Sequence, residues 1–389
     1  MSSNIADILE ACIHKGDMVL QALKKQSFAP DSEKRLDRRF NQAQAAKMID
    51  VTPQGLRKAE IEGRLPDPSK DQDNNRKFYT LEQINQARDY FKTRPGRRKG
   101  DPTLVQAVIN FKGGVFKTTI ALHEAQYLAL KGYRVLLIDA DSQASSTRFF
   151  VFNPDDSSKR MYTIGDFLTG EINSLEPAIL KTCWDSLDII PANLSLYNAE
   201  LQLPFKAGKG TISKQFYNLL RDGIETVKDN YDIVLIDAPP SLGIISMNVI
   251  YAADALVIPV PPSYSDFTST LQFFNMLREV VDAIGDREYS FIRLLLTKFD
   301  ASEESIAFAK IIRHVFGSDM LLQSVFSNTA EITRASQNLR TVYEQTDIKV
   351  KKTYDRAITI IDRFCAELEL LIKASWPSYS EQYVSEGVF

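Results

Sequence analysis

The chain has 389 residues, 44% of them hydrophobic, which is enough for two or three domains with a large apolar core. Its formal net charge of −3 excludes a histone-like basic coat and a strongly acidic chain. The charge is unevenly spread, because residues 1–100 hold 20 Lys and Arg against 14 Asp and Glu, whereas the remainder holds 27 against 36. A basic N-terminal part on an acidic body is typical of a DNA-contacting head joined to an enzyme.

Three cysteines, Cys12, Cys183 and Cys365, lie far apart and match no metal-binding or redox spacing. We expect them to be reduced core residues. No apolar run approaches membrane-spanning length, and the N-terminus lacks the apolar segment of a signal peptide. The segment 376–389 is mixed polar and acidic, unlike a membrane-binding basic helix. We therefore expect a cytoplasmic protein without a membrane partner.

Residues 1–35 are expected to form an N-terminal helix. Apolar residues recur there at helical spacing, at Ile5, Ile8, Leu9, Cys12, Ile13, Val19, Leu20 and Leu23. Such a stripe can pack on its own domain or on a partner chain. Because little globular sequence surrounds it, we favour a dimerisation element.

Residues 36–93 predict a compact helical unit. A helix is expected over 41–49, and after a turn Thr52 and Pro53 supply an N-cap and a first helical position for a second helix over 54–62. A polar stretch and a third helix follow. The pattern resembles a winged helix-turn-helix of the MerR-like kind, in which a short polar wing follows the recognition helix.

In such a unit the second helix enters the major groove of DNA. Gln54, Arg57 and Lys58 are placed on that helix to reach base edges and phosphates, and Arg76 and Lys77 would lie on the wing. The alternative is a small three-helix spacer whose basic residues are merely solvated.

Residues 94–103 have the composition of a linker, because proline and glycine interrupt helices there. Four basic residues of this segment, Arg94, Arg97, Arg98 and Lys99, are expected to stay in water.

Residues 104–389 predict an α/β domain in which a parallel sheet is flanked by helices. Continuous apolar runs alternate with amphipathic stretches, as in parallel sheets that are covered on both faces. The expected strands are 104–109, 135–138, 187–190, 233–236, 255–260, 292–296 and 321–325. The expected helices include 118–131, 212–227, 267–284 and 306–316.

The first of these strands runs into a phosphate-binding loop. Gly113 and Gly114 let the backbone N–H groups converge on an anion, and the next helix adds its positive N-terminal end. Lys117 supplies a point charge for the terminal phosphates and Thr118 a hydroxyl for magnesium. The predicted nucleotide-binding residues are Lys112, Gly113, Gly114, Val115, Phe116, Lys117, Thr118 and Thr119. A glycine turn between a core strand and a helix is the plain structural alternative.

Acidic residues follow two further strands. Asp139 and Asp141 end the run 135–138, and Asp237 ends the run 233–236. Because ligands in open parallel sheets bind at the carboxyl ends of the strands, these side chains are expected beside the loop. Asp141 could instead only cap the next helix.

The loop, with its extra lysine Lys112 five residues before Lys117, resembles the deviant Walker A loop of the ParA/MinD ATPase superfamily. Phe111 and Phe116 stand where the commonest form has glycines, as in the plasmid-partition branch with a DNA-binding extension. The resemblance implies a Mg²⁺-dependent ATPase that binds ATP and ADP, in which Lys112 reaches the nucleotide of the partner subunit in a dimer.

The same resemblance assigns the acidic residues and Thr118. It implies that Asp141 orients the attacking water, that Asp139 supports the magnesium shell, and that Asp237 holds magnesium opposite Thr118. The catalytic residues expected from the resemblance are therefore Lys112, Lys117 and Asp141.

The resemblance covers almost the whole chain and implies plasmid partition. An ATP-bound homodimer would bind non-specific nucleoid DNA, Arg334 being the first choice for a contact, and a ParB-like centromere-binding partner would stimulate hydrolysis. The helix-turn-helix would also bind operator DNA and repress the partition operon. Two alternatives stay open: a nucleotide-sensing repressor without cargo transport, and a MinD-like membrane-cycling ATPase.

Overall fold

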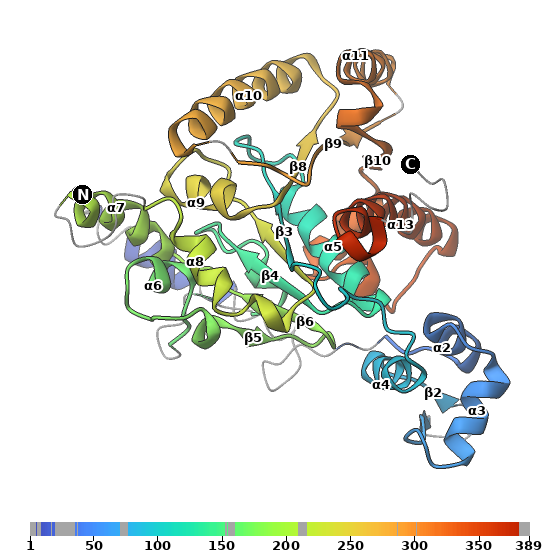
Figure 1. Ribbon diagram of the computed structural model, residues 1–389. Coiled ribbons are helices and arrows are strands. Elements are labelled where there is room, and N and C mark those ends of the chain that lie inside the picture. The colour runs from blue at the N-terminus through green and yellow to red at the C-terminus, as the bar shows by residue number, and fades with distance from the viewer. Residues whose placement is uncertain are drawn as a thin grey trace.

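The computed structural model describes residues 5, 9–16, 18, 19, 36, 38–70, 77–151, 154, 160–208, 216–285, 287–300 and 302–380. An eight-stranded sheet with the strand order β10-β9-β8-β3-β7-β4-β6-β5 forms its centre (Figure 1). The strands are β3 (Leu104–Val108), β4 (Val135–Asp139), β5 (Leu180–Lys181), β6 (Leu187–Ile190), β7 (Ile233–Asp237), β8 (Ala255–Val260), β9 (Phe291–Phe299) and β10 (Leu321–Ser327).

All neighbouring strands of the sheet pair in parallel except β5, which pairs antiparallel with β6. Every predicted strand is present, and only the two-residue edge strand β5 was not expected. In the register of β4 and β7, Asp139 lies opposite Asp237. The predicted acidic strand ends therefore meet at one edge of the sheet, next to the end of β3.

Helices cover both faces of the sheet, which explains why the central strands are buried along their whole length. The helices of this domain are α5 (Lys117–Lys131), α6 (Ile164–Leu168), α7 (Ser195–Gly208), α8 (Leu219–Glu225), α9 (Ile244–Ala252), α10 (Tyr264–Ile284), α11 (Glu303–Met320), α12 (Ala330–Gln337) and α13 (Lys351–Ala374). One core lies under α5, α12 and α13, and the other lies under α6 to α11.

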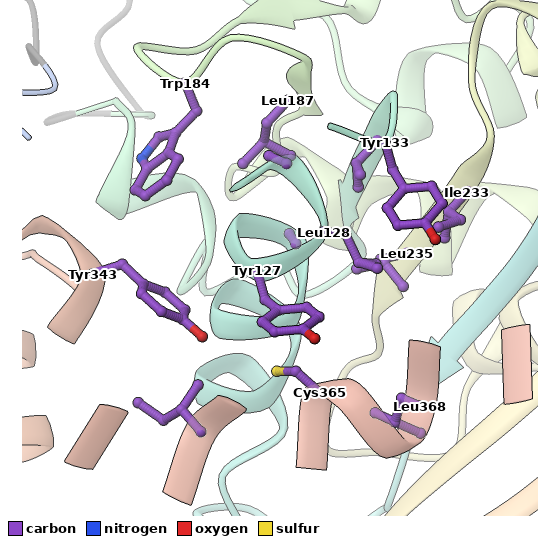
Figure 2. Packing of buried hydrophobic residues seen from close by; sticks show 14 of the residues in the cluster. Tyr127, Leu128, Tyr133, Trp184, Leu187, Ile233, Leu235, Tyr343, Cys365 and Leu368 are labelled. Carbon is purple, nitrogen blue, oxygen red and sulfur yellow. The ribbon is translucent and has the colours of Figure 1, made fainter. Parts of the chain in front are cut away.

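Figure 2 shows the first core, where the aromatic ring of Tyr127 on α5 faces Cys365 on α13. The hydroxyls of Tyr127 and Tyr133 both donate hydrogen bonds to the buried Glu369 of α13, at 3.0 and 2.9 Å. Helix α5 and the residue pair that follows it are thus held to α13 by packing and by polar contacts near the C-terminal end of α5. Its sequence carries apolar residues all round, as expected for a helix buried between a sheet and a second helix.

The N-terminal unit contains α2 (Gln42–Ile49), α3 (Pro53–Ile61), a ladder of β1 (Ser69–Lys70) with β2 (Lys77–Phe78), and α4 (Leu81–Phe91). The predicted cap Thr52 is present, because its side chain accepts a backbone N–H of the first turn that follows. The side chains of Asn41 and Thr80, which were not predicted as caps, do the same for α2 and α4. In Figure 1 this unit (blue) lies at the end of the molecule opposite α10.

The segment 94–103 packs on the domain that contains the eight-stranded sheet, so the expectation that its basic residues stay in water is wrong for Arg94 and Arg97. Arg94 donates to the carbonyl of Gly132 at 2.8 Å, and Arg97 donates to the carbonyl of Asp229 at 2.8 Å. Their side chains are only 23% and 20% exposed. The composition of the segment is typical of a linker. Its guanidinium groups, however, donate hydrogen bonds to carbonyls of neighbouring segments and so fix the segment in place.

Residues 9–16, 18 and 19 are helical, as predicted for the N-terminal segment. Ile5, Leu9 and Ile13 are between 56% and 73% exposed, so these members of the stripe do not pack on the described part of the chain. Ile8, Leu20 and Leu23 lie outside the described residues. Cys12 is exposed as well, which corrects its expected place in a core, whereas Cys365 is buried. Within the described ranges, no helix combines the length and the apolar character needed to cross a bilayer.

Candidate nucleotide-binding site

The loop between β3 and α5 leaves open space where an anion would bind. A Cβ added at Gly113 would meet no atom within 4 Å, and both Gly113 and Gly114 are exposed. Gly114 takes a left-handed backbone with φ 71°, which glycine adopts without strain. The N-terminus of α5 has no side-chain cap, so its N–H groups remain directed at this space.

The two phenylalanines of the loop turn their rings away from the open space. Phe111 packs edge-on against Phe273 of α10, with ring centroids 4.8 Å apart, and Phe116 packs edge-on against Phe326 of β10 at 5.6 Å. Phe116 holds the left-handed conformation usually left to glycine, at φ 73°. Its packing on Phe326 offsets a backbone cost of about 1–2 kcal/mol. The loop thus keeps its shape without the glycine.

Lys117 is 7% exposed and donates from Nζ to the carbonyl of Lys112 at 3.0 Å. Burial lowers its pKa, while the neighbouring Asp237 and Asp141 act to raise it. An anion bound in the loop would offset the burial of this charge. The position therefore fits a phosphate-binding lysine.

Asp237 is buried, and its Oδ2 accepts a hydrogen bond from the Ser146 hydroxyl at 2.8 Å. Its Oδ1 has no hydrogen-bond partner of acceptable geometry within the described part of the chain. Burial raises the pKa of this carboxyl, against the hydroxyls of Thr118 and Ser146 and the charge of Lys117, which lower it. A buried carboxylate oxygen without a donor, beside a hydroxyl, fits a hard divalent cation.

Asp139 is differently placed, because both its oxygens are occupied by its own chain. Oδ2 accepts from the backbone N and the hydroxyl of Thr147 at 2.8 and 2.7 Å, and Oδ1 accepts from the backbone N of Asp141 at 3.1 Å. Burial and the neighbouring Asp237 raise its pKa. Asp139 thus fixes the loop that carries Asp141.

Asp141 is half-buried at the edge of the site, and one of its oxygens accepts from the backbone N of Gln143 at 2.9 Å. Beside the first turn of α5 lies a cavity of about 430 Å³. Its lining residues are Phe116, Thr119, Asn328, Ile332, Thr333, Ser336 and Gln337. The site therefore combines open space at the glycine loop, a buried carboxylate that fits a cation, and a neighbouring pocket.

The predicted DNA-contacting residues fall into separate groups. Gln54, Arg57 and Lys58 are exposed together on α3, opposite the buried side of that helix. Lys77 lies in β2, and Arg76 falls outside the described residues.

Arg334 is far from this group in the sequence and lies on α12. It pairs with Glu331 at 2.8 Å and donates to the carbonyl of Asp347 at 3.2 Å, with 28% of its side chain exposed. It lines a cavity of about 410 Å³ together with Arg340 and Lys349.

Sequence reasoning missed three polar residues that shape the site: Asn110, Ser146 and Asp266. Asn110 holds the backbone N of Lys112 through its Oδ1 at 2.9 Å, and Ser146 holds Asp237. Asp266 forms an ion pair with Lys112 at 2.5 Å. Only Asp266 left a signal in the sequence, since an acidic residue three positions after Ser263 is typical of a helix start.

A strand that runs into a glycine loop, a buried lysine at the next helix and acidic ends on adjacent parallel strands define a P-loop nucleoside triphosphatase. The AAA domain family matches residues 103–288. Protein SopA of Escherichia coli is 37% identical over 384 residues, covering 96% of this chain and 99% of SopA. The chain belongs to the ParA family of plasmid partition ATPases, as its motifs predicted.

Further comparisons agree with this assignment. The chromosome partitioning protein ParA of Caulobacter vibrioides is 33% identical over 238 residues, which cover 60% of this chain and 84% of that protein. A solved structure named Partition Protein superposes with a TM-score of 0.68 at 21% identity, over 95% of this chain and 99% of that chain. A McdA–ATP complex from Cyanothece gives 0.54 at 19% identity, over 67% and 97%. The two structures confirm the predicted α/β fold.

Proposed function

We propose that the chain is a DNA-segregation ATPase whose ATP-bound homodimer binds non-specific nucleoid DNA in the cytoplasm and releases it after hydrolysis. The observation that carries this proposal is the different placement of two lysines on one loop. Lys117 is buried beside Asp237, whereas Lys112 is 35% exposed on the outer part of the loop. The first is suited to the nucleotide of its own subunit, and the second to that of a partner.

The proposed chemistry is phosphoryl transfer to water, which depends on positioning and charge neutralisation. The loop N–H groups and Lys117 bind the phosphates, and Asp141 orients the attacking water. Thr118 and Asp237 would hold Mg²⁺, and Asp139 would support this magnesium site. When bound, the ion would neutralise charge on the phosphate oxygens.

Two DNA-binding activities are proposed for separate surfaces. The exposed side of α3, with Gln54, Arg57 and Lys58, reads operator DNA, and Arg76 and Lys77 contact it from the wing, so that the protein represses its own operon. Arg334 contributes to non-specific DNA binding by the ATP-bound dimer. A ParB-like centromere-binding protein stimulates hydrolysis, and the exposed apolar side of the N-terminal helix contributes to dimerisation.

The substitution Lys112→Gln tests whether Lys112 is needed for the ATP-dependent dimer. We expect the variant to bind ATP but to lose the ATP-dependent dimer, because the charge that reaches the partner's phosphates is removed. Sedimentation velocity in ATP and Mg²⁺ measures this, with nucleotide binding followed in parallel. An ATP-dependent dimer as stable as that of the wild type contradicts the assignment.

The rate of ATP turnover distinguishes the partition ATPase from the alternative, a nucleotide-sensing repressor. A partition ATPase is expected to hydrolyse ATP faster when random-sequence DNA and the neighbouring operon product are both added. Operator binding that responds to ATP, with no ATP-dependent binding to random DNA, would favour a nucleotide-sensing repressor.

A further inference from the structure

Lys112 already has a partner in its own chain. Its Nζ lies 2.5 Å from Oδ1 of Asp266, in the first turn of α10. The two side chains are 35% and 19% exposed, so the pair is partly shielded from water and from salt. The lysine proposed to act across the dimer is therefore bound within one subunit here.

The carboxylate of Asp266 is fixed before it meets the lysine. The hydroxyl of Ser263, the N-cap of α10, donates to Oδ2 of Asp266 at 2.5 Å and accepts from the Asp266 backbone N at 3.2 Å. An anion in the first turn is also favoured by the helix dipole. Because Ser263 already orders the side chain of Asp266, forming the ion pair with Lys112 costs less side-chain entropy than it would if both side chains were free.

The backbone of Lys112 is tied to the same part of the sheet. Asn110 accepts the Lys112 N–H and donates from Nδ2 to the carbonyl of Pro259 in β8, both at 2.9 Å. The carbonyl of Lys112 accepts Nζ of Lys117 at 3.0 Å. Both the main chain and the amine of Lys112 are thus held by residues of one subunit, between β8 and the start of α10.

We propose that Asp266 is a positioning residue for Lys112, which holds the amine within its own subunit until the phosphates of a partner-bound nucleotide replace the carboxylate. This proposal rests on the proposed function of Lys112. Dimer closure then exchanges one ion pair for another in each subunit, and ADP, which lacks the terminal phosphate, competes less well for the amine. Asp266 opposes closure in the absence of ATP and sets the concentration at which the dimer forms.

The size of the effect follows from the number of pairs that are broken. A solvent-accessible ion pair contributes up to about fivefold to an equilibrium constant. Two such pairs are lost when one dimer forms, so the dimerisation constant should change by up to about 25-fold. Asp266→Asn removes the charge but can still accept the Ser263 hydroxyl, so the start of α10 is retained.

The test measures the dimer dissociation constant by sedimentation in Mg²⁺ and a non-hydrolysable ATP analogue. We expect Asp266→Asn to dimerise about tenfold more tightly than the wild type and to form dimers at lower analogue concentrations. Asp266→Glu, which keeps the charge, should dimerise like the wild type. Asp282→Asn is the matched control, because Asp282 is at the other end of α10 and pairs with Arg278 at 3.7 Å on the exposed surface. That variant should leave the constant unchanged.

A wild-type or weaker dimer of a folded Asp266→Asn variant overturns the inference. The double variant Lys112→Gln/Asp266→Asn supplies the second criterion, because it must behave as Lys112→Gln alone. If Asp266→Asn tightens the dimer even without Lys112, the effect does not pass through this ion pair and the inference is wrong. Normal dimerisation of Lys112→Gln by itself contradicts the proposed function instead, so the two failures are distinguishable.

Discussion

Glu124 is a carboxylic acid in the middle of the phosphate-loop helix, with none of its surface exposed. Gln106 of β3 donates from Nε2 to both of its oxygens at 2.8 Å. Burial raises the pKa of Glu124 to about 8, from 4.5 in the unfolded chain. Between these two values the folded protein binds a proton that the unfolded chain releases. The free energy of unfolding therefore falls as the pH rises through this window, by up to about 1.4 kcal/mol per pH unit.

Glu124→Gln should remove this dependence, because an amide can accept from Gln106 without a charge to bury. We expect the variant and the wild type to unfold at similar temperatures at pH 5. At pH 8 the free energy of unfolding of the variant should be higher by about 3 kcal/mol. Thermal unfolding followed by circular dichroism at the two pH values measures the difference. The exposed Glu82, substituted in the same way, controls for the loss of one charge. Equal unfolding temperatures at pH 8 would show that Glu124 is ionised at no cost in the fold.

Individual residues of the site were predictable where their chemistry is local. Gly113, Gly114 and Lys117 are recognisable because the loop needs their conformation and charge. The structure leaves open space at Gly113 and buries Lys117 at the start of α5. The ion pair between Lys112 and Asp266 was not predictable. It joins residues 154 positions apart, and only the parallel pairing of β3 with β8 brings them together.

At the level of elements, hydrophobic periodicity and helix caps predicted helices and strands, whereas short edge strands could not be predicted. Thr52 marked the start of α3, since it supplies the side-chain acceptor that a helix start needs. The structure shows that Asn41 and Thr80 cap α2 and α4 in the same way. The two-residue strand β5 carries no alternation long enough to detect. Its pairing depends on β6 lying at the edge of the sheet.

The helix α3 presents Arg57 on its exposed side, and we expect Arg57→Ala to weaken operator binding. Loss of a bidentate contact to a base should cost about 1–3 kcal/mol in affinity. ATP-dependent binding to random DNA should be unchanged, because α3 belongs to the other proposed surface. Fluorescence anisotropy with operator and random duplexes at one salt concentration compares the two. Arg278→Ala, on the exposed side of α10, is the control, and equal losses on both duplexes would contradict a sequence-reading role.

Across the whole molecule, one buried arginine joins the N-terminal unit to the nucleotide domain. Arg88 of α4 is 2% exposed and donates to the carbonyls of Met48 in α2 and Leu130 in α5, at 3.1 and 2.8 Å. It also donates to the side chain of Asn85 at 2.6 Å, and Asn85 in turn donates to Asp185 at 2.6 Å. Burial lowers the pKa of Arg88 to about 10. The C-terminal end of the phosphate-loop helix is therefore fixed to the unit proposed to read DNA.

Because α5 begins at the phosphate loop and ends at Lys131, beside the contact between Arg88 and Leu130, it connects the loop to the N-terminal unit as one rigid element. Arg88→Ala would leave one buried acceptor, on Asn85, and two partly buried carbonyls without this donor, at a cost of about 3 kcal/mol. We expect the N-terminal unit to unfold separately, as a lower-temperature transition in calorimetry, while the nucleotide domain keeps its own transition. Arg88→Lys, which keeps the charge but not the planar set of donors, should give an intermediate result. A single transition at the wild-type temperature would mean that the two units are held together mainly by their shared apolar contacts.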